Sequence, residues 1–117
     1  MATNVVNDSG ATIRKKMTVG ASQVKNSVIL LNEMPVFLLE DADSSNKATC
    51  VLPGTMVVDL AVVGANGAGN IAVAVGHRIY KDGTEYNRDS TNGTLFGYAL
   101  GAVNSGATTT IPVLMFA

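Results

Sequence analysis

Short apolar runs separated by polar turns follow one another along most of this chain. Residues 28–31 and 35–39 are apolar, with residues 32–34 between them, so this stretch predicts two strands joined by a tight turn. Residues 48–52 predict a further strand. It ends at the Pro-Gly pair at 53–54, a dipeptide typical of turns.

The middle of the chain holds its longest β-branched stretch, residues 56–63, with apolar side chains at nearly every position. A strand covered on both faces has this pattern. A glycine-rich loop over residues 64–70 follows it. Residues 71–75 are too few for periodicity to separate a strand from one helical turn, so both interpretations stay open.

Residues 75–87, VGHRIYKDGTEYN, carry a strong hairpin signal. Asp82 and Gly83 supply the positive φ angles that a tight primed turn requires. Tyr80 and Tyr86 flank this turn. We expect them opposite or diagonal to each other, where cross-strand aromatic contacts add roughly 0.2–1 kcal/mol. These four residues therefore predict a rigid structural hairpin.

Two further strands are predicted in the last third of the chain. Residues 94–100 contain Gly97, and a glycine inside a strand often marks a bulge or a close approach of another backbone. Residues 108–116 contain Pro112, which has no N–H group and therefore predicts an edge strand or a bulge. Several short strands with turn signals and no convincing long helix together predict a small single-domain all-β barrel or sandwich.

The N-terminal residues differ from the rest because they are polar, small and weakly patterned. Residues 1–23 therefore predict an arm that is extended or ordered only on a partner, and residues 24–117 predict the folded domain. The arm carries the basic triplet Arg14, Lys15 and Lys16. Three cations in a chain of net charge −1 bind nucleic acid weakly, so we interpret them as solvated or facing a partner protein.

Composition favours association with other proteins. Charged residues make up 15% of the chain, against about 25% in ordinary domains, so little charge keeps copies apart. No nucleic-acid or membrane partner is expected, because the net charge is near zero and the longest apolar run, residues 56–65, is far shorter than the ~20 residues that span a bilayer. The polar start lacks the features of a signal peptide, and one cysteine allows no intrachain disulfide, so we expect a protein made in a reducing cytoplasm.

Residues 64–69, GANGAG, have the glycine spacing of a phosphate-binding loop. Such a loop continues with a lysine, which neutralises phosphate charge, and a serine or threonine, which binds magnesium. Asn70 and Ile71 stand at these two positions and replace neither group. We therefore interpret the segment as a mobile glycine loop, and no cofactor is predicted.

The other candidates for chemistry are isolated. His77 is the only histidine and lacks the nucleophile and orienting group that general-base catalysis requires. Cys50, without a second cysteine, predicts a small buried apolar side chain rather than a zinc ligand. Glu40, Asp41 and Asp43 lack the later ligands of a calcium loop. The sequence therefore predicts no catalytic residue, no metal site and no enzyme.

Four stretches in the second half form a recognisable order. They are GHRIYKDG at 76–83, NGTLFGYAL at 92–100, the Ser-Gly pair at 105–106 and IPVL at 111–114. This order resembles the small capsid cement, or decoration, proteins of tailed phages. Their members tend to show a Gly-Asp-x-Val-Tyr strand with an acidic turn, then a Leu/Ile-x-Gly-x-Ala-Leu strand and a terminal Val-x-Leu strand.

The resemblance covers most of residues 24–117. In the first half it lies in the order of two apolar strands, an acidic loop, a strand and a glycine. His77 stands where the family often has aspartate, and the arm has no counterpart in it. The resemblance implies a compact β domain of the β-tulip type that assembles as a homotrimer. It also implies a place on the outer surface of the virion, where such proteins clamp adjacent subunits of the major capsid protein against internal DNA pressure.

A role for the arm follows as a hypothesis. An extended segment can add a strand to an exposed strand of the capsid, and Arg14, Lys15 and Lys16 would then meet acidic groups there. Two other classes remain as alternatives. One is a head–tail or tail-tube structural protein, and the other is a small β-barrel module that binds a ligand such as a sugar or peptide. The absence of tryptophan weighs against sugar binding.

Overall fold

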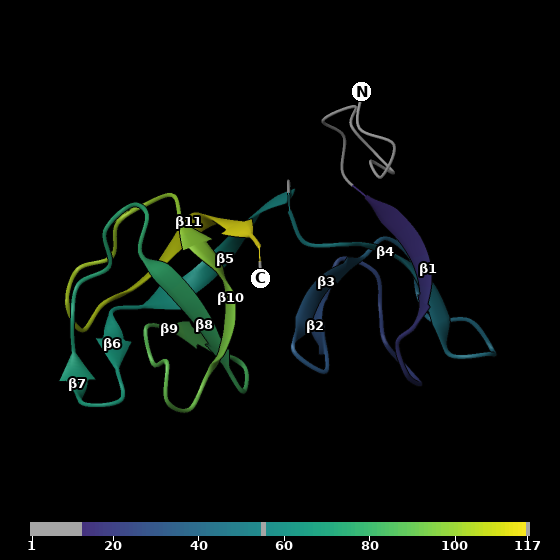
Figure 1. The fold of residues 1–117 in the computed structure, drawn as a ribbon, viewed down its shortest axis with the longest axis horizontal. Coiled ribbons are helices and arrows are strands. Elements are labelled where there is room, and N and C mark those ends of the chain that lie inside the picture. The colour runs from purple at the N-terminus through teal and green to yellow at the C-terminus, as the bar shows by residue number, and fades with distance from the viewer. Residues whose placement is uncertain (1–12, 55, 117) are drawn as a thin grey trace, which may run out of the picture.

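The computed structural model describes residues 13–54 and 56–116, and these residues form strands, turns and loops without a helix (Figure 1). The all-β prediction is therefore confirmed. The strands are β1 (Arg14–Thr18), β2 (Val28–Leu31), β3 (Met34–Leu38), β4 (Lys47–Val51), β5 (Met56–Val63), β6 (Ala65–Asn66), β7 (Gly69–Asn70), β8 (Arg78–Asp82), β9 (Glu85–Asn87), β10 (Thr94–Ala99) and β11 (Thr108–Met115).

The first four strands form an antiparallel sheet in the order β1-β4-β3-β2. The predicted turn between β2 and β3 is present, and Asn32 in it has a positive φ of 57°. Successive side chains of β3 and β4 point to opposite faces of the sheet, and those on one face form a small core. Its buried members are Val19, Val36, Leu38, Ala48 and Cys50.

The later strands form a closed barrel in the order β10-β11-β5-β9-β8 (Figure 1, left). All its neighbours are antiparallel except β5 and β9, which pair in parallel at a single position. The barrel encloses the larger core, in which the side chains of Phe96, Ile79, Val62, Val113 and Met115 are fully buried. The predicted barrel is therefore present and uses five of the eleven strands.

The sheet and the barrel contact each other through one face of the sheet. Val51 of β4 is buried as a member of the barrel core, and Val28 and Phe37 pack against the same core. These three residues are neighbours in the sheet, since Phe37 pairs with both Val28 and Val51. The contact joins both parts into one small domain.

The predicted arm needs a correction where the structure describes it. Residues 14–18 form β1, which pairs with all five residues of β4, and Val19 is buried in the core of the sheet. The folded domain therefore begins about ten residues before the predicted boundary at residue 24. The rest of the predicted arm, residues 1–12, lies outside the described residues.

The expectation that β5 is covered on both faces is wrong. Val58 and Val62 point into the barrel core, whereas Val57 is 50% exposed and Asp59 and Ala61 are exposed as well. The strand is thus buried on one face only, as a barrel strand should be. Its outward apolar residues form part of the surface.

The hairpin is present, but its turn lies one residue later than predicted. Asp82 pairs with Glu85, so Gly83 and Thr84 are the two residues of the loop. Gly83 has a φ of +63° and Asp82 is not in the left-handed region. A glycine at the first loop position is the pattern of a II′ turn, which joins twisted strands as well as the expected Asp-Gly turn would.

The two tyrosines of the hairpin do not face each other. Tyr80 pairs with Asn87 and Tyr86 pairs with Lys81, so the tyrosine side chains lie on opposite faces of the hairpin. Tyr86 points into the barrel and is 8% exposed, while Tyr80 is half-buried. The expected cross-strand tyrosine pair is therefore wrong, and each ring contacts other residues.

Residues 71–75 form neither a strand nor a helical turn. Only Val73 makes a bridge, to Val103, and both side chains are buried in the barrel core.

Gly97 in β10 marks both a bulge and a close approach of another backbone, the two features predicted for it. The register between β10 and β8 shifts between Leu95 and Gly97, and a Cβ at Gly97 would lie 1.8 Å from the carbonyl oxygen of Leu114.

Pro112 pairs regularly with Asp59 of β5, so it marks no bulge. The pairing of β11 with β10 covers only Val113–Met115, so Pro112 lies at a local edge on that side, as one of the two predictions for it requires. The Pro112 carbonyl accepts a hydrogen bond from the N–H of Leu100, one residue beyond the end of β10. The N–H and C=O of one residue point to the same side of an antiparallel strand. The missing N–H would therefore point toward Leu100, outside the described β10–β11 pairing, which is a position where a strand tolerates proline.

Candidate functional site

The basic triplet lies on β1, at one end of the four-stranded sheet. The side chains of Arg14, Lys15 and Lys16 are all exposed. Among the described strands, β4 alone pairs with β1, which leaves the other side of β1 as a sheet edge. A sheet edge presents backbone donors and acceptors to a further extended chain.

Two hydrogen bonds fix which backbone groups face this edge. The N–H of Leu52 donates to the carbonyl of Ile13, and the N–H of Val19 donates to the carbonyl of Asn46. Backbone groups alternate in direction along an antiparallel strand, so the odd-numbered residues of β1 face β4. The N–H and C=O of Arg14, Lys16 and Thr18 therefore point outward. We call them the free edge of β1.

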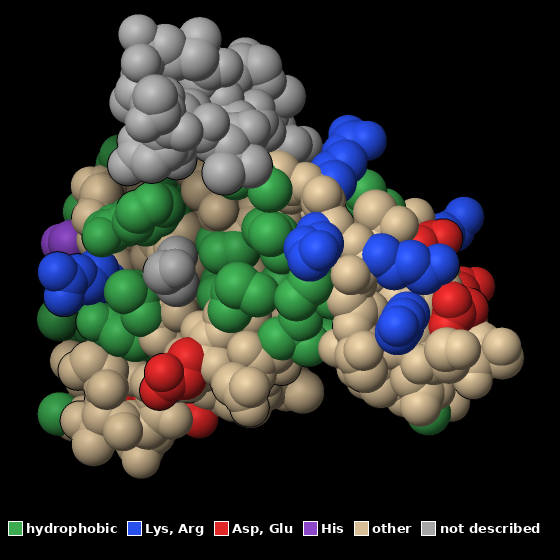
Figure 2. All heavy atoms as spheres, turned by 45° about the vertical axis from the view of Figure 1, so that its right-hand side comes forward, with side chains coloured by type: hydrophobic (Ala, Val, Ile, Leu, Met, Phe, Trp, Pro, Cys, Tyr) green, Lys and Arg blue, Asp and Glu red, His purple; other side chains and the backbone are tan. Residues whose placement is uncertain are grey.

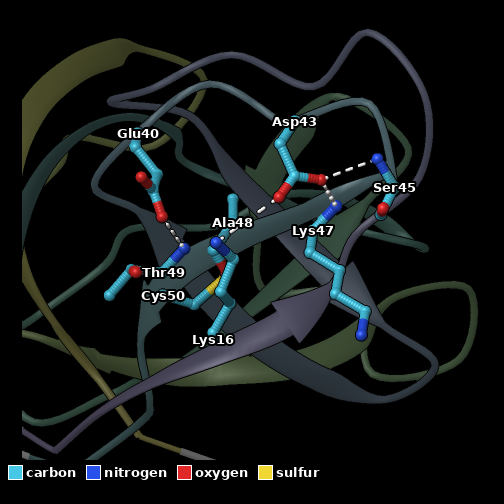
Figure 3. Close-up of polar contacts among 8 residues, drawn as sticks. All are labelled: Lys16, Glu40, Asp43, Ser45, Lys47, Ala48, Thr49 and Cys50. Carbon is cyan, nitrogen blue, oxygen red and sulfur yellow. Dashed lines mark hydrogen bonds and ion pairs between the residues drawn. The ribbon is translucent and has the colours of Figure 1, made fainter.

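A polar loop between β3 and β4 holds the end of β1 in place (Figure 3). One carboxylate oxygen of Asp43 accepts hydrogen bonds from the N–H groups of Ser45 and Lys47, at 2.8 and 3.0 Å. Its other oxygen lies 3.4 Å from the Nζ of Lys16. The two backbone N–H groups, followed by Lys16, hold the pKa of Asp43 below its usual range.

Glu40 plays a similar part at the other end of the loop (Figure 3). Its Oε2 accepts a hydrogen bond of 2.6 Å from the N–H of Thr49, next to the backbone bond from Leu39 to the Thr49 carbonyl. The carboxylate thus continues the β3–β4 ladder by one rung. The hydrogen bonds from Thr49 lower the pKa of Glu40. We interpret both acids as groups that stiffen β4, against which β1 is paired.

The three acids considered for calcium are therefore engaged separately. Glu40 binds Thr49 and Asp43 binds Ser45 and Lys47, while the Oδ1 of Asp41 accepts the N–H of Lys25 at 2.9 Å. No group of three potential metal ligands occurs in residues 13–54 and 56–116. Cys50 is fully buried, as expected, and burial raises the pKa of its thiol.

His77 and the glycine loop also have structural partners. The Nδ1 of His77 accepts a hydrogen bond of 2.9 Å from the N–H of Ala74, which closes the tight turn before β8. The glycine loop is a small hairpin of β6 and β7, and the N–H of Gly64 donates to the carbonyl of Ala107. The carboxylate of Asp89 lies against Gly67. This places negative charge where a phosphate loop needs a cation.

Asp89, which the sequence places in a turn, is 6% exposed and holds that turn together. Its carboxylate accepts hydrogen bonds from the N–H groups of Thr91 and Asn92 and from the Asn92 side chain, at 2.8–3.1 Å. These bonds lower its pKa, with those from Asn92 contributing most. The signal in the sequence was an aspartate followed by Ser-Thr-Asn-Gly, which is typical of a side-chain-capped turn.

The same loop borders a polar hollow of about 330 Å³, lined by Asn66, Gly67, Ala68, Arg88, Asp89, Ser90, Thr91 and Asn92. Asp89 and Asn66 bind neighbouring N–H groups, whereas the Nε of Arg88 is buried without a hydrogen-bond partner among the described residues. A ligand site needs several polar groups that converge on one point together with apolar walls. Ala68 is the one apolar side chain among the described lining residues other than glycine, so the hollow lacks apolar walls and gives the ligand-binding alternative little support.

The predicted hairpin residues have a structural role. The ring of Tyr86 stacks edge to face on Phe96, and the Nζ of Lys81 lies 4.8 Å from the centre of the Tyr86 ring. Gly83 lies in the loop and Asp82 ends the strand before it, while Tyr80 contacts Gly93, whose missing Cβ would lie 2.7 Å from the Cβ of Tyr80. The hairpin is thus a wall of the barrel.

Apolar side chains also reach the surface. Figure 2 shows hydrophobic side chains across the middle of one face, with Lys and Arg side chains on the side of the four-stranded sheet. The large hydrophobic side chains that are exposed belong to Ile13, Val24, Leu39, Val57, Val75, Leu100 and Phe116. Exposed sheet edges and contiguous exposed apolar side chains are features by which proteins bind one another.

The comparisons with known proteins add no relative: no family model, curated protein or solved structure matches this chain. Within the described residues, no helix is long and apolar enough to cross a membrane.

Proposed function

We propose that this protein is a capsid decoration protein of a tailed phage. It would bind the outer surface of the expanded head as a homotrimer and hold adjacent subunits of the major capsid protein together. The proposal rests on the resemblance of residues 24–117 to that family. The structural observation that supports it is the free edge of β1, which combines outward backbone groups with three exposed cations.

The free edge of β1 would act by strand addition. An extended capsid segment paired with β1 gains backbone hydrogen bonds from Arg14, Lys16 and Thr18, and these bonds give affinity without a preformed pocket. The side chains of Arg14, Lys15 and Lys16 favour a segment with acidic residues. Lys16 is partly neutralised by Asp43, so Arg14 and Lys15 carry most of the unpaired charge.

Binding of this kind stabilises the shell by mass action. A protein that binds only the expanded shell stabilises it by RT ln(1 + [L]/Kd), which is about 2.7 kcal/mol per site at a hundredfold excess over Kd. Several copies joined to one another would engage several capsid subunits at once. Weak single contacts then add up to tight binding.

The test is co-sedimentation of the protein with purified expanded empty heads of a tailed phage. Lys16→Pro removes an outward N–H and leaves the bonds between β1 and β4 in place, whereas Lys16→Ala removes only the side chain. We expect the proline variant to bind far more weakly than the alanine variant. Equal binding by the two variants would remove strand addition at β1, and failure of the wild-type protein to bind any heads would remove the decoration role.

A truncation separates β1 from the residues before it. A deletion that reached residue 16 would remove three of the five residues of β1 and their pairing with β4, so the variant to use lacks residues 2–12 only. Binding that survives this deletion but not Lys16→Pro assigns the contact to β1. Binding lost on deletion alone assigns it to the preceding segment.

A further inference from the structure

Outward side chains of three neighbouring barrel strands form a continuous apolar surface. In the register of β10, β11 and β5, Tyr98 lies beside Leu114, and Leu114 lies beside Val57. Leu100 follows β10 and is hydrogen-bonded to Pro112. We call this set the outer apolar face, and its members are Val57, Tyr98, Leu100, Pro112, Leu114 and Phe116.

This face is open to solvent in the single chain. Val57 is 50% exposed, Phe116 47% and Leu100 42%. The rings of Tyr98 and Phe116 lie 6.0 Å apart at 36°, so the two hold each other against the barrel. Single exposed apolar residues are ordinary, but a contiguous set across three strands marks an interaction surface.

Opposite charges flank the outer apolar face. Arg78 of β8 pairs with Tyr98 on one side, and Asp59 of β5 pairs with Pro112 on the other. Both side chains are exposed, and the one ion pair among the described residues does not include either of them. Each molecule therefore offers a free cation on one flank of the face and a free anion on the opposite flank.

We propose that the outer apolar face is the contact between copies of this chain, with Arg78 of one copy against Asp59 of the next. The charges are complementary only between two molecules, because β10 and β11 separate them within one barrel. When this contact is repeated in the same direction, so that each copy uses Arg78 toward one neighbour and Asp59 toward the other, it joins copies head to tail. Such contacts close into rings when the rotation allows it.

This inference deepens the proposed function, since it names the surface that would join the copies of a decoration protein. Its test needs no capsid, so it can fail while the free edge of β1 still binds heads. The measurement is sedimentation velocity of the free full-length protein over a series of concentrations. We expect the wild-type protein to self-associate and Val57→Glu to remain monomeric, whereas Val24→Glu, which changes a residue exposed before β2, should associate like the wild type.

Charge reversal tests the flanks separately. Arg78→Asp and Asp59→Arg should each weaken self-association at least tenfold, and the double variant should recover most of the loss because the pair is restored in reverse. Far-ultraviolet circular dichroism of each variant shows whether the barrel is intact. An intact double variant that associates no better than the single variants would overturn the pairing of Arg78 with Asp59.

Other occupants of the face give other results. A wild-type protein that stays monomeric up to its solubility limit would overturn the proposal. So would self-association that appears only after residues 2–12 are deleted, because that segment of the same chain would then be what covers the face. Unchanged association of Val57→Glu would place the contact elsewhere on the molecule.

Discussion

The ring of Tyr86 meets the ring of Phe96 edge to face in the barrel, with 5.1 Å between centroids and 73° between planes. Phe96 is fully buried, whereas Tyr86 closes the core from the side of β9. Edge-to-face pairs add about 0.5–1.5 kcal/mol beyond the area they bury. The hairpin thus stabilises the barrel through this contact rather than through a pair of its own tyrosines.

Phe96→Ala should lower the free energy of unfolding by about 3–5 kcal/mol, because it leaves a large cavity in a closed core. Denaturant unfolding of dilute protein measures the change. Phe116→Ala is the matched control, since that ring is 47% exposed and its loss leaves no internal cavity. A loss for Phe96→Ala no larger than that of the control would contradict the assignment of Phe96 to the core.

Burial raises the pKa of Tyr86 to about 12. Its folded-state pKa lies above the unfolded one, so the neutral hydroxyl stabilises the fold at neutral pH, and this contribution is lost as the pH rises from about 10 towards 12. In a spectroscopic titration, one of the three tyrosines should ionise last and together with unfolding. Tyr86→Phe should remove that last component, and removal of an earlier one would show that the assignment is wrong.

Much of the fold could be predicted from sequence because most strands are short apolar runs between strong turn residues. β2, β3, β4, β10 and β11 lie within two residues of the predicted ranges. β1 was missed because Arg14-Lys15-Lys16-Met17-Thr18 has a single apolar side chain, and one residue shows no period of two. Its place depends on backbone pairing with β4, which leaves no mark in the composition of an edge strand.

The basic residues of the candidate site could be predicted from the sequence, but the groups that surround them could not. The triplet Arg14, Lys15 and Lys16 stands out as a charge cluster, whereas the ion pair of Lys16 with Asp43 joins positions 27 residues apart, counted from 16 to 43. For β5 the apolar pattern predicted more burial than the strand has. Apolar residues at outward positions were taken for a second buried face, but they lie on the surface, and Val57 among them belongs to the outer apolar face.

Gly97 and Gly83 are required for different reasons, so their replacement by alanine should lower the free energy of unfolding by different amounts. A Cβ at Gly97 would lie 1.8 Å from the backbone oxygen of Leu114, so Gly97→Ala must push β10 and β11 apart and should cost about 3 kcal/mol or more. Gly83 has open space around it and a φ of +63°, so Gly83→Ala should cost only about 1 kcal/mol. Thermal unfolding ranks the two, and the reverse order would refute the close approach of β10 to β11.

Asp43 should make the protein sensitive to acid. Its folded-state pKa is lowered, chiefly by the N–H groups of Lys47 and Ser45, so the carboxylate stabilises the fold above its ordinary pKa and loses this effect as the pH falls through the lower folded-state value. We expect the free energy of unfolding to fall less steeply with acid in Asp43→Asn than in the wild type. Unfolding curves collected from neutral pH down to pH values below the usual aspartate range measure this slope.

Lys16→Gln separates the causes, because it removes the ion pair and keeps both backbone hydrogen bonds of Asp43. An exposed ion pair contributes little. The acid response of Lys16→Gln should therefore stay close to that of the wild type and remain steeper than that of Asp43→Asn. If Lys16→Gln instead matched Asp43→Asn, the ion pair rather than the backbone of the loop would control Asp43. Lys16 would then be committed to the fold, and Arg14 and Lys15 alone would be left to meet an acidic partner.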